Sequence, residues 1–208
     1  MRHSLIQTDI LGIVGVNSLT LRTEDQILQI THELSGQWTI PVLLALENCG
    51  GRFTPLQQQL AIAPARLSDN LKRMCISGLI QHISPHERRH PLLPEYVLTE
   101  KGRLYREAAR SVQLAEANIG YGRLSAKAWN VPVLLALDFK YERFQEIRLA
   151  LQQVTPGILS TRRKELNTDG LVDKVLTEQP RPSFLYQLNG FTKKPVHQLA
   201  VDLFSLVR

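Results

Sequence analysis

The chain has little of what most enzymes, metal sites and exported scaffolds require. Its 208 residues include only two cysteines, Cys49 and Cys75, which cannot form a disulfide framework and favour a reducing compartment. Three histidines recur at intervals of four from His82, but Pro85 would break the helix that could bring them to one face, so no metal site is expected. The sequence also has no phosphate-binding loop, nucleophile elbow or acid–base pair of recognisable spacing, so neither enzymatic activity nor a cofactor is expected.

Long apolar runs are missing as well. The apolar residues between Leu5 and Val16 are interrupted by the polar residues 7–9 and fall well short of the ~20 consecutive apolar residues that span a bilayer. No small-residue cleavage signature clearly follows them. Residues 1–22 are therefore expected to pack on the body of the protein or on a partner. The chain is expected to be cytoplasmic, with no membrane association.

Both signs of charge are present, with basic residues in excess. Lys and Arg number 25 against 19 Asp and Glu, which gives a formal net charge of +6 and a sequence pI near 9.5. This excess is compatible with a nucleic acid or another anionic surface as partner, and alone it does not distinguish them. A hydrophobic content of 43% with 21% charged residues is typical of a folded globular chain and excludes wholesale disorder.

The sequence does contain an internal repeat. The segment Trp38–Glu47 returns as Trp129–Asp138, and Arg52–Phe53 returns in register as Arg143–Phe144. Further matches follow in the same order: Pro64, Leu67, Ser68, Lys72, Gly78–Ile80, Tyr96 and Leu98 in the first copy, and Pro156, Leu159, Ser160, Lys164, Gly170–Val172, Tyr186 and Leu188 in the second. Chance hardly produces several blocks in one order. The chain is therefore expected to hold an N-terminal segment, 1–22, and two related modules, 23–116 and 117–208.

Three helices are expected at the start of the first copy. Apolar residues at helical intervals predict a leading helix over 23–34, and a Leu-rich second helix over 38–48. Thr54 is expected to cap a short third helix that ends near Leu60, with Gln57 reaching back as the capping-box partner.

A fourth helix follows a short turn. Pro64 suits its first position, and Gly78 suits the left-handed conformation that commonly ends a helix. The inward face of this helix is expected to carry Leu67, Leu71 and Met74.

A hairpin and a last helix complete the copy. Short strands are expected at 79–83 and 95–98, on either side of a Pro- and Arg-rich loop at 84–94, and a last helix over 100–116. The second copy repeats this pattern with a shorter loop. After the leading helix, each copy therefore has three helices, a hairpin and a last helix, which is the winged helix-turn-helix arrangement. The expected fold class is α+β, mainly helical, with two tandem winged helix-turn-helix modules forming a pseudo-dimer.

Several motifs of the first copy occur together in a known family. In chain order they are Gly36–Trp38 at the start of a Leu-rich helix, Arg52–Phe53, Ile62–Met74, Gly78–Ile80, Pro94–Thr99 and Lys101–Arg103. In these motifs residues 23–115 resemble the HxlR-type transcriptional regulators of bacteria, and the second copy is similar less specifically. The resemblance implies dimeric winged-helix DNA binding, often in response to redox or electrophilic stress. Members usually have one module per chain, so two modules imply a pseudo-dimer within one chain. The leading helix has no cysteine of the kind that many members use for sensing.

The fourth helix of each copy holds the candidate DNA-contacting residues, because the second helix of a helix-turn-helix enters the major groove. The candidates are Arg66, Ser68, Asn70, Lys72 and Arg73 in the first copy and Ser160, Thr161, Arg162, Arg163 and Lys164 in the second. Asn70 is expected to pair with adenine and the arginines with guanine, whereas Ser68 and Lys72 are expected to contact phosphate. The alternative is a solvated helix face with no partner.

The loops of the two hairpins carry further cations. Arg88 and Arg89 lie between two prolines in the first loop, and Arg181 lies at the tip of the second. Basic wing tips commonly lie against phosphate or in the minor groove, and the alternative is a soluble loop without a partner. The second wing is the less basic, so the second module is expected to bind DNA more weakly or to serve another purpose.

Two positions depart from the family pattern. Arg163 takes the place of the inward residue Leu71, so either the second copy's helix is rotated or shifted there, or the arginine reaches outward along its stem. Cys75 follows Lys72 and Arg73, so either its thiol has a lowered pKa and reports oxidation, or it packs as a small hydrophobic residue.

The leading hypothesis is a sequence-specific transcriptional regulator whose partner is double-stranded DNA, in the cytoplasm and associated with the nucleoid. Two alternatives stay open. The first is a winged-helix platform that binds a protein partner or a further copy of the chain, motivated by the weakly basic second wing and the apolar residues 5–16. The second is a plasmid-type replication initiator, because tandem winged helices also occur in that class.

Overall fold

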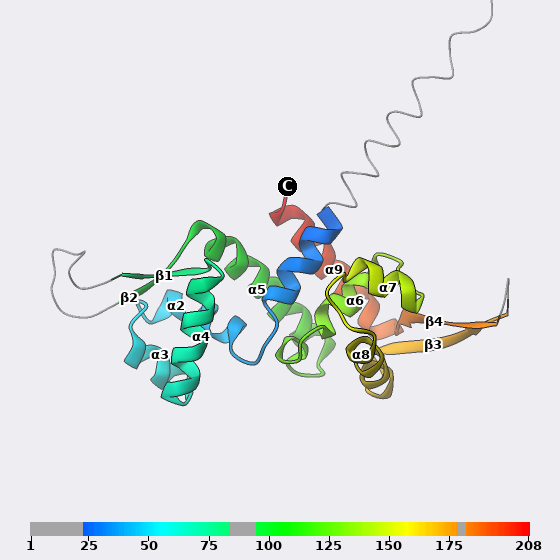
Figure 1. Ribbon diagram of the computed structural model, residues 1–208, viewed down its shortest axis with the longest axis horizontal. Helices are drawn as coiled ribbons and strands as arrows, with labels where there is room; N and C mark the ends of the chain where they lie inside the picture. Colours follow the sequence, from blue (N-terminus) through cyan, green and yellow to red (C-terminus); the bar gives the residue numbers. More distant parts are fainter. Residues whose placement is uncertain (1–22, 84–94, 179–181) are drawn as a thin grey trace, which may run out of the picture.

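The computed structural model describes residues 23–83, 95–178 and 182–208, which form two similar modules joined at the centre of an elongated molecule (Figure 1). Module 1 begins with a leading helix over 23–33. Its other elements are α2 (Thr39–Asn48), α3 (Phe53–Leu60), α4 (Pro64–Ile76), β1 (Ile80–Ile83), β2 (Glu95–Leu98) and α5 (Glu100–Ile119). The order of elements confirms the sequence-based prediction of a winged helix-turn-helix.

Module 2 repeats this order without a leading helix of its own. A short turn of 3₁₀ helix, η2 (Leu124–Ala126), follows α5. The module then consists of α6 (Asn130–Asp138), α7 (Phe144–Ala150), α8 (Pro156–Thr168), β3 (Val172–Thr177), β4 (Ser183–Leu188) and α9 (Gly190–Leu206). The predicted fold class, mainly helical α+β with tandem winged-helix modules, is therefore confirmed.

Each module has an antiparallel hairpin that is tied to the turn before its third helix. β1 pairs with β2 and β3 with β4. In module 1 the Tyr96 N–H donates to the Gly51 carbonyl at 2.9 Å, and in module 2 the Tyr186 N–H donates to the Glu142 carbonyl at 3.0 Å. Gly51 has φ 69°, and a Cβ there would lie 2.0 Å from the Tyr96 oxygen, so this close approach requires glycine.

The predicted cap of the third helix is wrong. α3 begins at Phe53, one residue before Thr54, and its N-cap residue Arg52 makes no side-chain cap hydrogen bond. The early start follows from the tie between Gly51 and the hairpin, which fixes the chain immediately before Arg52. The equivalent helix α7 does have an acceptor at its third position, since the Glu146 carboxylate accepts the Arg143 backbone N–H at 2.9 Å.

The α4 and α8 helices begin and end as predicted. Pro64 and Pro156 open them, and the Thr155 hydroxyl oxygen accepts the Ile158 backbone N–H at 3.3 Å as an N-cap, whereas Ala63 offers no cap. The predicted last helix of module 1 ends at 116, but α5 continues to Ile119, where Gly120 ends it.

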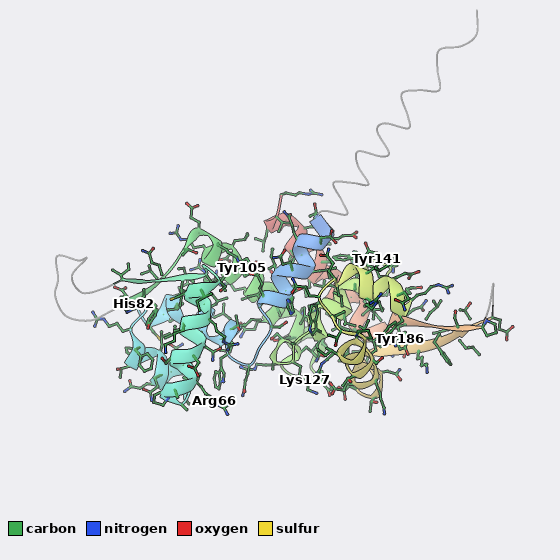
Figure 2. All side chains as sticks on the ribbon, in the orientation of Figure 1. Arg66, His82, Tyr105, Lys127, Tyr141 and Tyr186 are labelled. Atoms are coloured by element: carbon green, nitrogen blue, oxygen red, sulfur yellow. The ribbon has the colours of Figure 1, made fainter. Side chains whose placement is uncertain are left out.

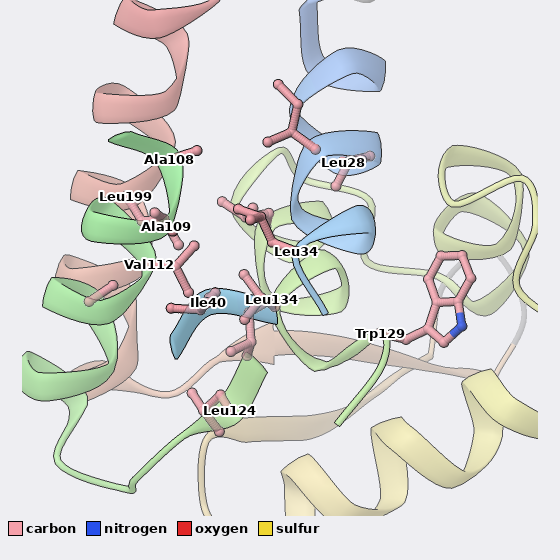
Figure 3. Packing of buried hydrophobic residues seen from close by; sticks show 14 of the residues in the cluster. Leu28, Leu34, Ile40, Ala108, Ala109, Val112, Leu124, Trp129, Leu134 and Leu199 are labelled. Atoms are coloured by element: carbon pink, nitrogen blue, oxygen red, sulfur yellow. The ribbon is translucent and has the colours of Figure 1, made fainter. Parts of the chain in front are cut away.

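The two modules share one hydrophobic core, which lies where α5 packs along its counterpart α9. Residues from the leading helix, α2, α5, α6 and α9 converge there, among them Leu28, Ile40, Val112, Leu134 and Leu199 (Figure 3). The space left between α5, α6 and α9 is only about 10 Å³. This packing of equivalent helices makes the two modules a pseudo-dimer within one chain. No helix in the described ranges is long and apolar enough to cross a membrane.

Candidate nucleic-acid interface

The two helices that correspond to recognition helices lie on one side of the molecule. Figure 1 shows α4 running from the level of β1 down to the lower edge of the molecule, where α8 also lies, with the two hairpins pointing outward at opposite ends. Arg66 of α4 and Lys127 of the connection before α6 lie along the same side (Figure 2). A single surface therefore carries both helices, which is the arrangement that a two-fold winged-helix dimer presents to duplex DNA.

The orientation of α4 follows from its buried face. Leu67, Leu71 and Met74 are 0–3% exposed, as predicted, and they attach the helix to the core of module 1. The opposite face carries the exposed cationic residues Arg66, Lys72 and Arg73, together with Ser68, which is half-buried. These four predicted residues therefore share one outward surface.

Asn70 does not join that surface, and the prediction that it points outward is wrong. It is 6% exposed, and its side-chain amide donates to the Arg66 carbonyl at 2.7 Å. Its amide oxygen accepts a hydrogen bond from the Arg73 guanidinium at 2.6 Å. Both ends of the amide are therefore occupied within α4, and Asn70 holds Arg73 in place.

α8 presents a different outward face. Ser160, Thr161 and Lys164 are exposed as predicted, but Arg162 and Arg163 are not. The Arg162 guanidinium forms an ion pair with Glu165 at 2.5 Å, and its Nε is buried without a partner. The dense basic cluster that the sequence suggests is thus largely directed back onto the protein.

Arg163 occupies the inward position of α8, and neither sequence-based alternative describes it. The helix is not rotated, because Leu159 and Leu166 on the same face are fully buried. The guanidinium lies between two rings, 4.5 Å from the centre of Phe144 and 4.0 Å from the centre of Tyr186. Burial lowers the pKa of this guanidinium from its ordinary value, although it remains charged at any physiological pH.

One further cation lies near the two candidate recognition helices and was not among the residues predicted from the sequence. Lys127 lies between α4 and α8 in the view of Figure 2, and its amine pairs with Glu165 of α8 at 3.2 Å. Its side chain is 56% exposed. The sequence feature that could have pointed to Lys127 is its position two residues before Trp129, at the junction of the two repeats.

The remaining residues singled out in the sequence are the three arginines of the wing loops and Cys75. Arg88, Arg89 and Arg181 lie outside the described residues. Cys75 is half-buried, and burial raises the pKa of its thiol, which outweighs the opposing effect of a hydrogen bond from the His82 backbone. The suggestion of a lowered thiol pKa is therefore wrong, and of the two interpretations of Cys75 the packed side chain is the one that fits.

The geometry defines a tandem winged helix-turn-helix protein with both candidate recognition helices on one face. Residues 33–117 and 124–200 each match the HxlR-like helix-turn-helix family. These two matches span most of the chain, so the protein belongs to this family, and the resemblance seen in the sequence is confirmed. The family is one of DNA-binding transcription regulators. Comparisons with curated proteins and with solved structures return no match.

Proposed function

We propose that the protein is a sequence-specific DNA-binding transcriptional regulator that uses both winged-helix modules of one chain, in the cytoplasm and associated with the nucleoid. The observation that carries this proposal is the position of α4 and α8 on the same side of an intramolecular pseudo-dimer (Figure 1). A regulator with one module per chain needs a second copy to obtain this arrangement. Here the second module is part of the same chain, so the two helices are paired at any protein concentration.

Within α4 the exposed cations divide into two roles. Arg66 and Arg73 have the planar guanidinium that pairs with guanine, and Asn70 orients one of them through its 2.6 Å hydrogen bond. Ser68 and Lys72 contact phosphate in this proposal. Asn70 acts by positioning Arg73 and does not touch a base.

Module 2 contributes fewer charges. Ser160, Thr161 and Lys164 of α8 offer one cation and two hydroxyl groups to DNA, and Lys127 adds a second cation beside them. Arg88, Arg89 and Arg181 are proposed to reach phosphate from the wings. The preferred DNA site is therefore an imperfect palindrome with half-sites about 34 Å apart, in which the half read by α4 dominates.

The test is the salt dependence of binding to a site selected from random DNA. We expect the affinity of the wild-type chain to fall by about 10³-fold or more between ~50 and ~200 mM salt. Lys72→Gln should weaken binding to all sequences and lower the salt slope by about one. The matched control is Lys140→Gln, since Lys140 is an exposed cation of module 2 next in sequence to Tyr141, which lies away from α4 in Figure 2. A chain that binds no DNA at low salt would contradict the proposal.

One observation favours a second candidate function, a platform for a protein partner. The wing of module 2 exposes Val175, Leu176 and Phe184 to 42%, 56% and 50%. Leu176 and Phe184 are register partners on one face of the hairpin, and exposed apolar side chains of this kind are more typical of a protein contact than of a phosphate contact. Co-purification of a stable partner by a chain that fails the salt test would favour this function.

A further inference from the structure

Because the modules repeat, the molecule contains two equivalent contact regions, one around Trp129 and the other around Trp38. We call them the first and the second seam, and they can be compared residue by residue. In the first seam the leading helix lies against module 2. The His32 ring stacks on the Trp129 indole, with centroids 3.8 Å apart and planes inclined by 21°. The Tyr141 hydroxyl donates to the Glu24 carboxylate at 2.8 Å. The cavity left in this seam is only about 80 Å³.

The second seam lies in module 1 and is much looser. The sequence spacing that relates Trp38 to Trp129 also relates His32 to Arg123, so the pair Arg123–Trp38 is the counterpart of His32–Trp129. The Arg123 guanidinium lies 6.0 Å from the Trp38 ring centre. Between α2 and α3 on one side and the end of α5 with the connection to module 2 on the other is a cavity of about 640 Å³.

The cause of this difference is the course of the chain after α5. Gly120 and Gly122 have φ of 73° and 103°, so the chain turns away where a helix equivalent to the leading helix would continue. As a result Pro41 and Leu44 line the cavity and are half-buried, whereas their counterparts Pro132 and Leu135 are buried. The same helix sequence is thus covered in module 2 and open in module 1.

The walls of the cavity have the composition of a small-molecule site. Its volume lies within the range of about 300–1,000 Å³ that is typical of ligand pockets, and apolar residues of α2 form the floor. Amide side chains that can donate or accept hydrogen bonds surround the floor: Gln37, Asn48, Gln59 and Gln113.

Two charged residues line this cavity, and they differ in exposure, since Glu116 is buried whereas Arg123 is exposed. The carboxylate of the buried Glu116 accepts the Ser125 backbone N–H at 2.6 Å. The exposed Arg123 donates from one Nη to the Gln37 carbonyl at 2.7 Å, which leaves the rest of its guanidinium fork for a carboxylate. We infer that this cavity binds a planar organic anion, an aromatic carboxylate whose ring lies on Pro41 and Leu44 and whose charge meets Arg123.

The site connects the two halves of the molecule. One wall belongs to α2 and α3 of module 1, and the other belongs to the end of α5 and the connection that leads to module 2. A bound ligand fixes the angle between the modules and hence the spacing between α4 and α8. This regulatory consequence rests on the proposed DNA-binding function, whereas ligand binding itself does not.

The experiment is isothermal titration calorimetry of the full chain with 2-naphthoate, and with 2-naphthamide as the uncharged equivalent. We expect saturable 2-naphthoate binding with a dissociation constant between about 10 µM and 1 mM. The amide, and the variant Arg123→Gln with 2-naphthoate, should each bind about 10-fold more weakly. Lys140→Gln should bind like the wild type. Leu44→Trp, which fills the cavity, should abolish binding while an unchanged unfolding temperature shows that the fold is intact.

The inference fails if no saturable binding occurs up to ~5 mM 2-naphthoate, or if Arg123→Gln binds as tightly as the wild type. A second arm measures DNA affinity with and without 2-naphthoate for the wild type and for Leu44→Trp. A shift in the wild type alone supports regulation, and no shift despite ligand binding overturns the regulatory part. Calorimetry without DNA decides the binding claim even if the proposed DNA-binding function fails.

Discussion

At the level of single residues, the difference between the modules is clearest at one core position, which holds Leu71 in module 1 and Arg163 in module 2. Leu71 is fully buried, as expected for an inward residue of α4. Arg163 has a buried Nε without a hydrogen-bond partner, and its guanidinium is held by Phe144 and Tyr186. A cation in the sequence of a recognition helix is therefore not necessarily a cation at the DNA surface.

The variant Arg163→Leu tests this conclusion. It removes two cation–π contacts, worth about 2 kcal/mol when desolvated. It also removes a buried donor without a partner, whose cost is about 1–3 kcal/mol. We therefore expect the free energy of unfolding in urea to change by less than about 1 kcal/mol. DNA affinity should stay within about twofold of the wild type, because the guanidinium faces the core.

The control for this variant is Phe144→Leu, made alone and in the Arg163→Leu background. Phe144→Leu should cost more when Arg163 is present, since the ring then also loses its cation. A large loss of DNA affinity in Arg163→Leu with unchanged stability would mean that the guanidinium reaches DNA.

His32 gives a residue-scale prediction about pH. Burial lowers the pKa of this histidine from its ordinary 6.5, and the nearby Glu33 charge opposes that shift more weakly. Between the lowered pKa of the folded chain and 6.5, the unfolded chain binds more protons than the folded chain. The contribution of His32 to the free energy of unfolding is therefore fully present above pH 6.5 and decreases as the pH falls below 6.5.

The measurement compares the wild type with His32→Phe, which keeps a ring against Trp129 but cannot be protonated. The free energy of unfolding of the wild type should fall more than that of the variant between about pH 7.5 and 5.5. Parallel curves for the two proteins would refute the assignment.

At the level of elements, the sequence predicts best what is encoded locally. Pro64, Pro156 and Gly78 mark helix boundaries through their own backbone preferences, and the structure has those boundaries. The start of α3 was missed because a long-range hydrogen bond from Tyr96 to Gly51 determines it. The inward turn of Asn70 was missed because helical spacing alone does not reveal a hydrogen bond to Arg66.

The N-caps of α4 and α8 provide an element-scale prediction. Leu67 N–H and Leu159 N–H donate to the Ala63 and Thr155 carbonyls at the same 3.0 Å, but only Thr155 has a capping hydroxyl. Ala63→Ser should add the missing cap and raise the free energy of unfolding by about 1 kcal/mol. Thr155→Ala should lower it by a similar amount. Urea denaturation checks both, and an Ala63→Ser variant that is destabilised would contradict the prediction.

At the level of the whole molecule, the repeat predicted the two modules and their pseudo-dimer. It could not predict that the leading helix of module 1 would lie against module 2, where His32 stacks on Trp129. Such a contact depends on shapes that neither repeat encodes alone. The looser packing of the second seam, at Arg123 and Trp38, could not be predicted for the same reason.

The central claim is that one chain carries a complete pair of DNA-reading helices of unequal strength. Hydroxyl-radical footprinting on a selected site, with the number of bound chains measured in parallel, tests it most directly. We predict one chain per site and two protected stretches on one face of the duplex, about 34 Å apart, the weaker beneath α8. Scrambling the stronger half-site should cost more affinity than scrambling the weaker one. Two chains per site, each protecting a single stretch, would contradict the account.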